Sequence, residues 1–147
     1  MEYLLLLLAL LWVGSLLYTG YRKGRGSDIT PVHKWPASGA YATEVVGESF
    51  HADTLVELAK KYKGRGKPVP LAVLVPDDRN RHDDKAVRVE IDGYTVGHLS
   101  RADARCFRKR LSVLGFGTSP TGCNAQIRGY DGIFGVWLDI DPPCGDD

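Results

Sequence analysis

The sequence predicts a mainly β domain with two helices, an α+β fold arranged as a small six-stranded antiparallel barrel, behind a single transmembrane helix. Three observations predict this arrangement. Short alternating runs joined by hairpin-type turns recur along the chain. Two segments carry apolar residues at helical spacing, and the first 21 residues are almost wholly apolar. A chain of 147 residues has room for one domain and an appendage.

The apolar N-terminal segment, residues 1–21, has the composition of a membrane anchor. It contains one charged side chain, Glu2, and the basic cluster Arg22-Lys23-Gly24-Arg25 follows directly. About 20 apolar residues can cross a bilayer as a helix. Positive charge after the apolar run predicts an uncleaved, single-pass anchor with the C-terminal domain in the cytoplasm. The alternatives are a cleaved signal peptide, in which positive charge comes first, and a leucine-rich end that packs on a partner protein.

Residues 22–40 are rich in Gly, Ser and Pro and are predicted to be a juxtamembrane linker. Within this linker, Trp35 either contacts lipid headgroups together with Lys34 or marks the edge of the domain. The domain itself is expected over residues 41–141, followed by a flexible tail over residues 142–147.

The first half of the domain is predicted to contain a strand, a helix and a second strand. Residues 42–46 alternate weakly before Gly47, and residues 69–75 form an apolar run of strand length. Between them, residues 53–63 carry Leu55, Leu58, Ala59 and Tyr62 at helical spacing, with Asp53 as the expected N-cap. A basic run follows, made of Lys60, Lys61, Lys63, Arg65 and Lys67. It either offsets the helix dipole or contacts phosphates.

The centre of the chain joins a polar loop, residues 77–85, to a predicted hairpin. The strands cover residues 86–91 and 94–99, with Asp92-Gly93 between them. Asp-Gly between alternating runs predicts a type I′ turn, because both central residues need positive φ. Nine polar residues cannot be core, and loops carried on rigid strands often hold binding residues. The question of function is therefore what this loop binds.

The second predicted helix, residues 100–114, has a Ser100 cap with Asp103 three residues later. Its inward stripe is expected to be Ala104, Phe107, Leu111 and Leu114. Arg101, Arg105 and Arg108 share a neighbouring face, where they repel one another unless an anion lies nearby. This face is either simply solvated or faces nucleic acid. Two last strands are expected over residues 124–128 and 135–140.

Three motifs resemble the HIRAN domain over residues 42–140. They are Val45-Val46-Gly47-Glu48-Ser49-Phe50, the run Asn80-Arg81-His82-Asp83-Asp84-Lys85-Ala86-Val87-Arg88-Val89, and Ile91-Asp92-Gly93 leading into Val96-Gly97-His98-Leu99. The resemblance implies an OB/SH3-like barrel that binds single-stranded DNA at a free 3′ end, in DNA repair or phage-related contexts. It also implies that catalysis belongs to a fused or partner helicase or nuclease, so that this chain is not an enzyme.

The resemblance also implies the binding residues. Phe50 and His51, with His82 in the loop, would stack on terminal bases, and Asp83 would accept a hydrogen bond from the 3′ hydroxyl. The complete set is Ser49, Phe50, His51, Asn80, His82, Asp83, His98, Arg101 and Phe134. The two basic segments add Arg105, Arg108, Lys61 and Lys63 as secondary basic contacts. Ser49 stands where DNA-binding members have a basic residue, and Phe50, His51 and His82 stand where they have tyrosines. Structural alternatives are that Phe50 is core and that Asn80 and Asp83 cap their own loop.

Two other functions compete with DNA binding. A net charge of +1 is low for a DNA-binding protein, which favours a protein-interaction module that recruits a helicase or nuclease. The His82-Asp83 pair alone is a weak signal for a metal-dependent hydrolase. We expect no cofactor and no metal. The three cysteines form no CxxC pair and are expected to be reduced thiols.

Overall fold

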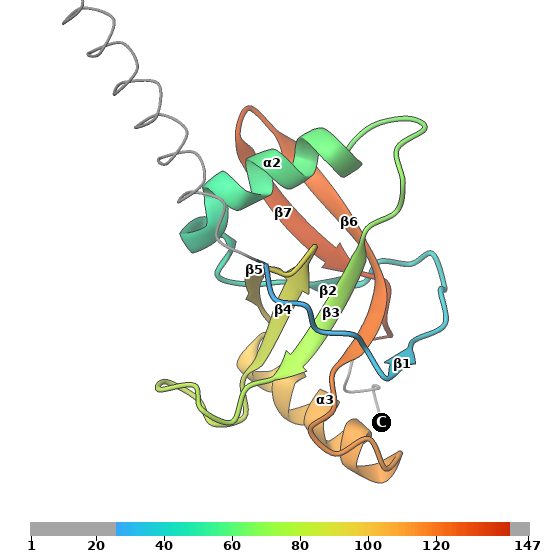
Figure 1. Cartoon of the computed structure of the whole chain (residues 1–147), viewed down its shortest axis with the longest axis vertical. Helices are drawn as coiled ribbons and strands as arrows, with labels where there is room; N and C mark the ends of the chain where they lie inside the picture. The colour runs from blue at the N-terminus through green and yellow to red at the C-terminus, as the bar shows by residue number, and fades with distance from the viewer. Residues whose placement is uncertain (1–25, 142–147) are drawn as a thin grey trace, which may run out of the picture.

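The computed structural model describes residues 26–141 and shows a mainly β fold with two helices and a curled, largely antiparallel sheet (Figure 1). The predicted anchor and tail lie outside these residues. None of the helices formed by residues 26–141 has the length and apolarity needed to cross a bilayer. The elements are β1 (His33–Lys34), β2 (Thr43–Glu44), the 3-10 turn η1 (Glu48–His51), α2 (Ala52–Tyr62), β3 (Leu71–Pro76), β4 (Val87–Ile91), β5 (Tyr94–His98), α3 (Arg101–Val113), β6 (Thr121–Tyr130) and β7 (Ile133–Leu138).

The sheet is curled so that its two edges meet at one point. Its strand order is β2-β7-β6-β3-β4-β5, with every neighbouring pair antiparallel, and β1 pairs with β6 in parallel. Just beyond β2, Val46 forms a bridge with His98 at the end of β5. The bridge has two backbone hydrogen bonds, of 2.8 and 2.9 Å. It brings the turn η1 next to the end of β5.

The segment predicted as a linker differs most from expectation, because it contributes a seventh strand and a core side chain. Trp35 is 7% exposed, and its indole N–H donates to Thr121 Oγ1 at 2.9 Å. Its ring packs edge-on against Phe107. Trp35 therefore belongs to the edge of the domain, which confirms that interpretation over a contact with lipid headgroups. Further towards the N-terminus, the Ser27 N–H donates to the Gly93 carbonyl at 2.7 Å, so residues 26–39 form a strap across the sheet.

Both tight hairpins use Asp-Gly turns. Asp92 and Gly93 have φ values of 53° and 78°, which confirms the predicted type I′ turn between β4 and β5. Asp131 and Gly132 repeat the same values between β6 and β7.

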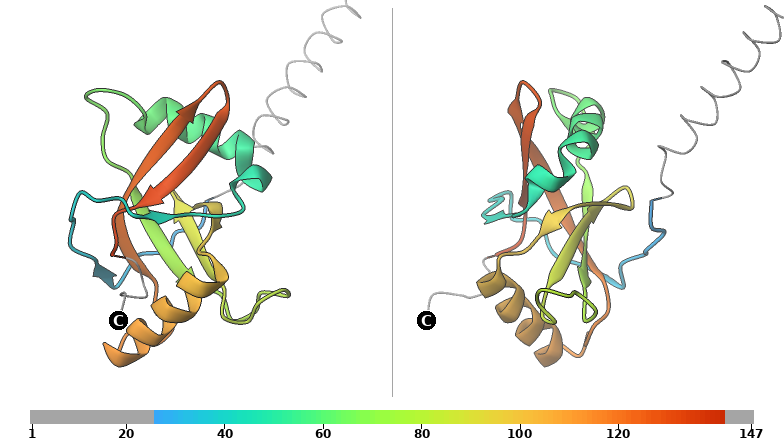
Figure 2. Two further views of the ribbon diagram at one scale, coloured as in Figure 1. Left: turned by 180° about the vertical axis from the view of Figure 1, so that it is seen from behind. Right: turned by 90° about the vertical axis from the view of Figure 1, so that its left-hand side faces the viewer.

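The two helices lie at opposite ends of the sheet, as Figure 2 shows. In α3 the Ser100 cap is confirmed, since its hydroxyl accepts from the Asp103 N–H at 3.1 Å. The Asp53 cap is wrong, because η1 runs directly into α2 and places Asp53 inside its first turn. Leu114 is exposed rather than inward, because α3 ends at Val113. The predicted inward residues of α2 and the remaining three of α3 do pack inward, with Tyr62 half-buried.

The cysteines only partly match expectation. Cys123 is free and buried in β6. Cys106 on α3 is disulfide-bonded, so the prediction of a reduced thiol is wrong for this residue.

Candidate functional site

The polar loop, residues 77–85, is fastened to α3 by the arginines that the sequence places on one face. The Arg108 side chain is 12% exposed and forms an ion pair with Asp78. It also donates to the carbonyls of Lys85 and Ala86, at 3.3 and 3.0 Å. The anions that relieve the predicted repulsion are therefore supplied by the loop itself.

Asp83 has the least exposed carboxylate of the four in the loop. It accepts from the Lys85 N–H at 3.0 Å and from Arg105 Nη1 at 3.2 Å, and its side chain is 10% exposed. The Lys85 hydrogen bond holds the pKa of Asp83 below its usual value, and the charges of Arg105 and Arg101 act in the same direction. The group is therefore an ionised hydrogen-bond acceptor that pairs with Arg105.

Asn80 and His82 have different surroundings in the same loop. Asn80 Oδ1 accepts from the N–H groups of His82 and Asp83, at 2.9 and 3.1 Å. This geometry confirms that Asn80 caps its own loop, as Asp83 also does through Lys85. The His82 side chain is exposed.

The turn η1 presents an aromatic side chain to solvent. Glu48 Oε1 accepts from the Val136 N–H at 2.9 Å, which ties η1 to β7. Burial raises the pKa of Glu48, although this hydrogen bond opposes the shift. Ser49 and Phe50 then point outward, and Phe50 is 87% exposed. The alternative that Phe50 is a core residue is wrong.

His51 is the last residue of η1, and His98 lies at the neighbouring end of β5. Burial lowers the pKa of His51. Burial also lowers the pKa of His98, and the charges of His51 and Arg88 lower it further against the opposing effect of Asp77. Both imidazoles are therefore neutral at pH 7 and offer ring faces and one N–H donor each.

These segments form one surface, which we call the end-site face: Ser49, Phe50, His51, His98, Arg101 and the loop residues Asn80, His82 and Asp83. In Figure 1, η1 and the loop lie on the left-hand side, with the end of β5 between them. The charges of His51 and of the loop residue Asp77 both affect the pKa of His98, and the charge of Arg101 affects the pKa of Asp83. Arg105 borders the face through its ion pair with Asp83.

Three of the predicted contacts lie elsewhere. Lys61 pairs with Asp92 at 2.6 Å. Asp92 precedes the start of β5, whereas His98 ends it, and the length of the strand separates the two ends by about 13 Å. Lys63 follows Lys61 beyond the end of α2. Phe134 is half-buried and packs against the core.

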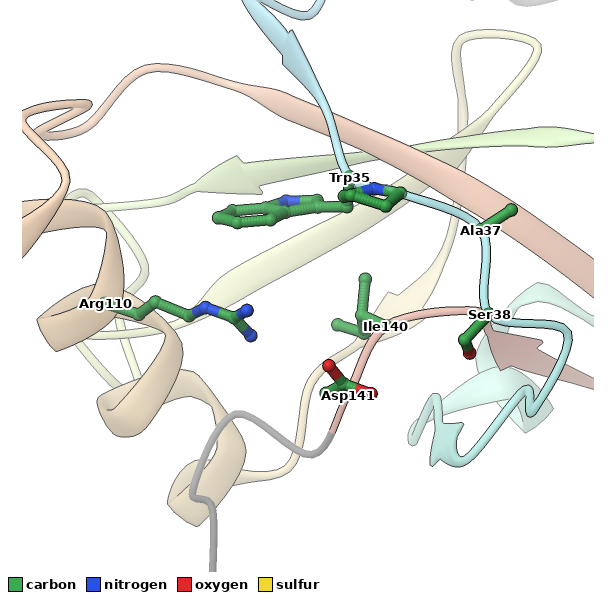
Figure 3. A pocket seen from close by; sticks show the side chains of 7 residues that line it. Trp35, Ala37, Ser38, Arg110, Ile140 and Asp141 are labelled. Atoms are coloured by element: carbon green, nitrogen blue, oxygen red, sulfur yellow. The ribbon is translucent and has the colours of Figure 1, made fainter.

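Two hollows were not anticipated from the sequence. A shallow groove of about 540 Å³ is lined by Lys85, Arg105, Arg108, Lys109, Ser112, Gly117 and Thr118. A smaller pocket, of about 150 Å³, lies under the strap between Trp35, Arg110 and Ile140 (Figure 3). The Arg110 guanidinium stacks on Trp35 at 4.7 Å. The sequence signal for the groove was Lys109, four residues after Arg105 on the same side of the helix.

Comparison with known proteins identified no relative: no family model, curated protein or solved structure matches this chain. Within residues 26–141, no group of three or more His, Cys, Asp or Glu side chains is placed to hold a metal ion, so His82 and Asp83 have no third ligand there.

Proposed function

We propose that this chain is a non-catalytic nucleic-acid-binding module that recognises single-stranded DNA at a 3′ end. The proposal includes kinship with the HIRAN domain and with OB/SH3-like barrels. The observation that carries it is the juxtaposition on the end-site face. On this face η1 carries His51 and the exposed Phe50, His98 lies at the end of β5, and the loop carries an ionised Asp83 that pairs with Arg105.

Each group has a distinct task in this proposal. Phe50 and the imidazoles stack on terminal bases, an interaction worth about 1–3 kcal/mol per base for any base. An ionised Asp83 accepts only, so it favours a hydroxyl and repels a phosphate. Arg101 begins α3, where cationic and backbone N–H groups both favour a phosphate. Together these preferences select a free 3′ hydroxyl.

The test compares two labelled oligonucleotides that differ only in a 3′ hydroxyl or a 3′ phosphate, using fluorescence anisotropy with the full-length chain in nanodiscs. We expect tighter binding of the hydroxyl form. Phe50→Ala should weaken binding about tenfold, from the loss of one stacked base. Asp83→Asn, which keeps the shape of the side chain, should abolish the preference. Tyr130→Ala is the matched control, because this exposed aromatic lies on the β6–β7 hairpin. No binding of either oligonucleotide at low salt would refute the proposal.

A recruitment module is the second candidate, favoured by the near-zero net charge and by exposed apolar side chains such as Phe50 and Ile133. Its binding to a partner protein would depend weakly on salt, whereas DNA affinity falls steeply as salt rises.

For location, we propose the predicted anchor over residues 1–21 with the domain in the cytoplasm. The basic cluster at residues 22–25 supports this orientation. The disulfide at Cys106 favours the opposite orientation, with the domain outside the cytoplasm, because disulfides persist mainly in oxidising compartments. Protease protection in intact and permeabilised cells distinguishes the two orientations.

A further inference from the structure

We infer that the groove on α3 is a binding site for the phosphodiester backbone of the same DNA strand, upstream of the 3′ end held by the end-site face. The inference rests on the proposed function and adds a path and a direction to it. The strand would run from Asp83 along α3 towards Gly117, with its phosphates in the groove.

The chemistry of the lining selects an anion. Its four ionisable side chains, Lys85, Arg105, Arg108 and Lys109, are all cationic, and Ser112 and Thr118 add hydroxyl donors. The loop and the helix that form the region, residues 77–85 and 101–110, carry eight Lys and Arg residues against five Asp residues. This excess of three positive charges exceeds the net charge of the whole chain, which is +1.

The cations of the groove differ in their availability. The Arg108 guanidinium already binds Asp78 and the loop carbonyls, so it lines the groove in a fixed position. Arg105 is 54% exposed and shared with Asp83. The exposed Lys109 forms no ion pair with any residue in the described range, and Lys85 has only a 3.9 Å contact with Asp84. Lys109 and Lys85 are therefore the side chains free to meet an incoming phosphate.

The groove is continuous with the end-site face. Arg101, Arg105 and Lys109 follow one another at four-residue spacing and form one ridge along α3. Eight residues of helix cover about 12 Å, which is long enough for more than one nucleotide of an extended strand. Arg105 joins the two sites, because it contacts Asp83 and also lines the groove.

The other basic run of the chain is less suitable for this strand. Lys63, Arg65 and Lys67 are exposed beyond the C-terminal end of α2, and η1 precedes the opposite end of that helix. An 11-residue helix is about 16 Å long, so these cations lie at the far end of α2 from η1 and its part of the end-site face.

The test uses the full-length chain in nanodiscs and oligothymidylates of 3 and 12 nucleotides, each with a free 3′ hydroxyl. Lys109→Ala should weaken binding of the 12-mer about three- to tenfold and lower its salt slope by about 0.7, the loss of one phosphate contact on a single strand. Binding of the 3-mer should not change. Lys67→Ala, at another exposed lysine outside the groove, should change neither.

The outcomes separate this inference from the proposed function. If Phe50→Ala weakens the 3-mer while Lys109→Ala leaves the 12-mer unchanged, end capture survives and the groove assignment is overturned. If Lys67→Ala reproduces the effect of Lys109→Ala, the path along α3 is overturned. If polyglutamate binds and Lys109→Ala weakens that binding to the same extent, the ligand of the groove is an acidic protein segment and the assignment to DNA is overturned. If the 12-mer depends on Lys109 but shows no preference for a 3′ hydroxyl, the proposed function fails and the direction of the strand fails with it.

Discussion

Arg105 on α3 and Asp83 in the polar loop lie 3.2 Å apart, and this ion pair joins two segments whose residues the sequence assigns to separate tasks. The carboxylate proposed to accept a 3′ hydroxyl also helps to hold its own loop. Because the Lys85 N–H occupies one oxygen of Asp83, the position of that carboxylate is set before any ligand arrives. A pre-positioned acceptor loses less freedom on binding.

The attachment of the polar loop to α3 predicts unequal effects for Arg108 and Arg105, the two arginines that hold it. Arg108→Ala should lower the free energy of unfolding by about 2–3 kcal/mol, because a largely buried guanidinium loses its hydrogen bonds to loop carbonyls. Arg105→Ala should cost less than about 1 kcal/mol, since the Arg105 side chain is 54% exposed and solvent screens its charge. Urea unfolding of both variants measures the difference. Equal losses would contradict the view that Arg108 is the main fastening.

The lowered pKa values of His51 and His98 predict that the stability of the fold falls in mild acid. Their pKa values are lowered in the folded chain from about 6.5, so the unfolded chain binds more protons as the pH drops. Stability should be insensitive to these groups above pH 6.5 and should decline below it, down to their folded pKa values. Thermal unfolding from pH 7.5 to 5 measures the decline. His98→Gln should reduce it, whereas His82→Gln, at an exposed loop position, serves as the control. An unchanged profile in His98→Gln would exclude His98 as a source.

Trp35 provides a test of whether the strap belongs to the fold. Trp35→Ala should cost about 3–5 kcal/mol, as for other buried aromatic side chains. Val32→Ala, at an exposed position of the same strap, should have little effect. Guanidinium unfolding compares the two variants. Similar small losses from both would mean that the strap behaves as the linker predicted from composition.

The cysteines predict distinct labelling by iodoacetamide. Burial raises the pKa of the Cys123 thiol to about 12, so it should remain unlabelled until the chain unfolds. Cys106 should be labelled only after a reductant has been added. Peptide mass spectrometry with and without reductant measures both. Labelling of Cys106 in the unfolded chain without reductant would show that its thiol is free. The disulfide would then no longer argue against a cytoplasmic location.

Local signals were predicted well because their causes lie within a few residues. The Asp92-Gly93 turn and the Ser100 cap depend on neighbours in sequence, and both are confirmed. Long-range partners were not predicted. Trp35 bonds to Thr121, which is 86 positions away, so the Gly, Ser and Pro content around it gave no sign of a strand.

The candidate site shows the same division. The repulsion among the α3 arginines could be anticipated from helical spacing, but the identity of their anions could not. Asp78 and Asp83 lie more than 20 positions away and reach α3 only after the loop has folded back on it. The exposure of Phe50 depends on how Glu48 ties η1 to β7, a contact that no local pattern reveals.

If residues 1–21 anchor the chain, the hydrogen bond from Ser27 to Gly93 also limits how far the domain can move from the membrane. If residues 1–21 span a bilayer as the sequence predicts, residues 22–25 alone connect that span to the strap. Four residues reach at most about 14 Å. The domain would then pivot close to the headgroups instead of drifting on a long tether, with the Lys61 end of α2 near the pivot, because Lys61 pairs with Asp92 in the same turn. DNA would have to come to the membrane surface to be captured, and the search volume of each molecule would be only a few nanometres across.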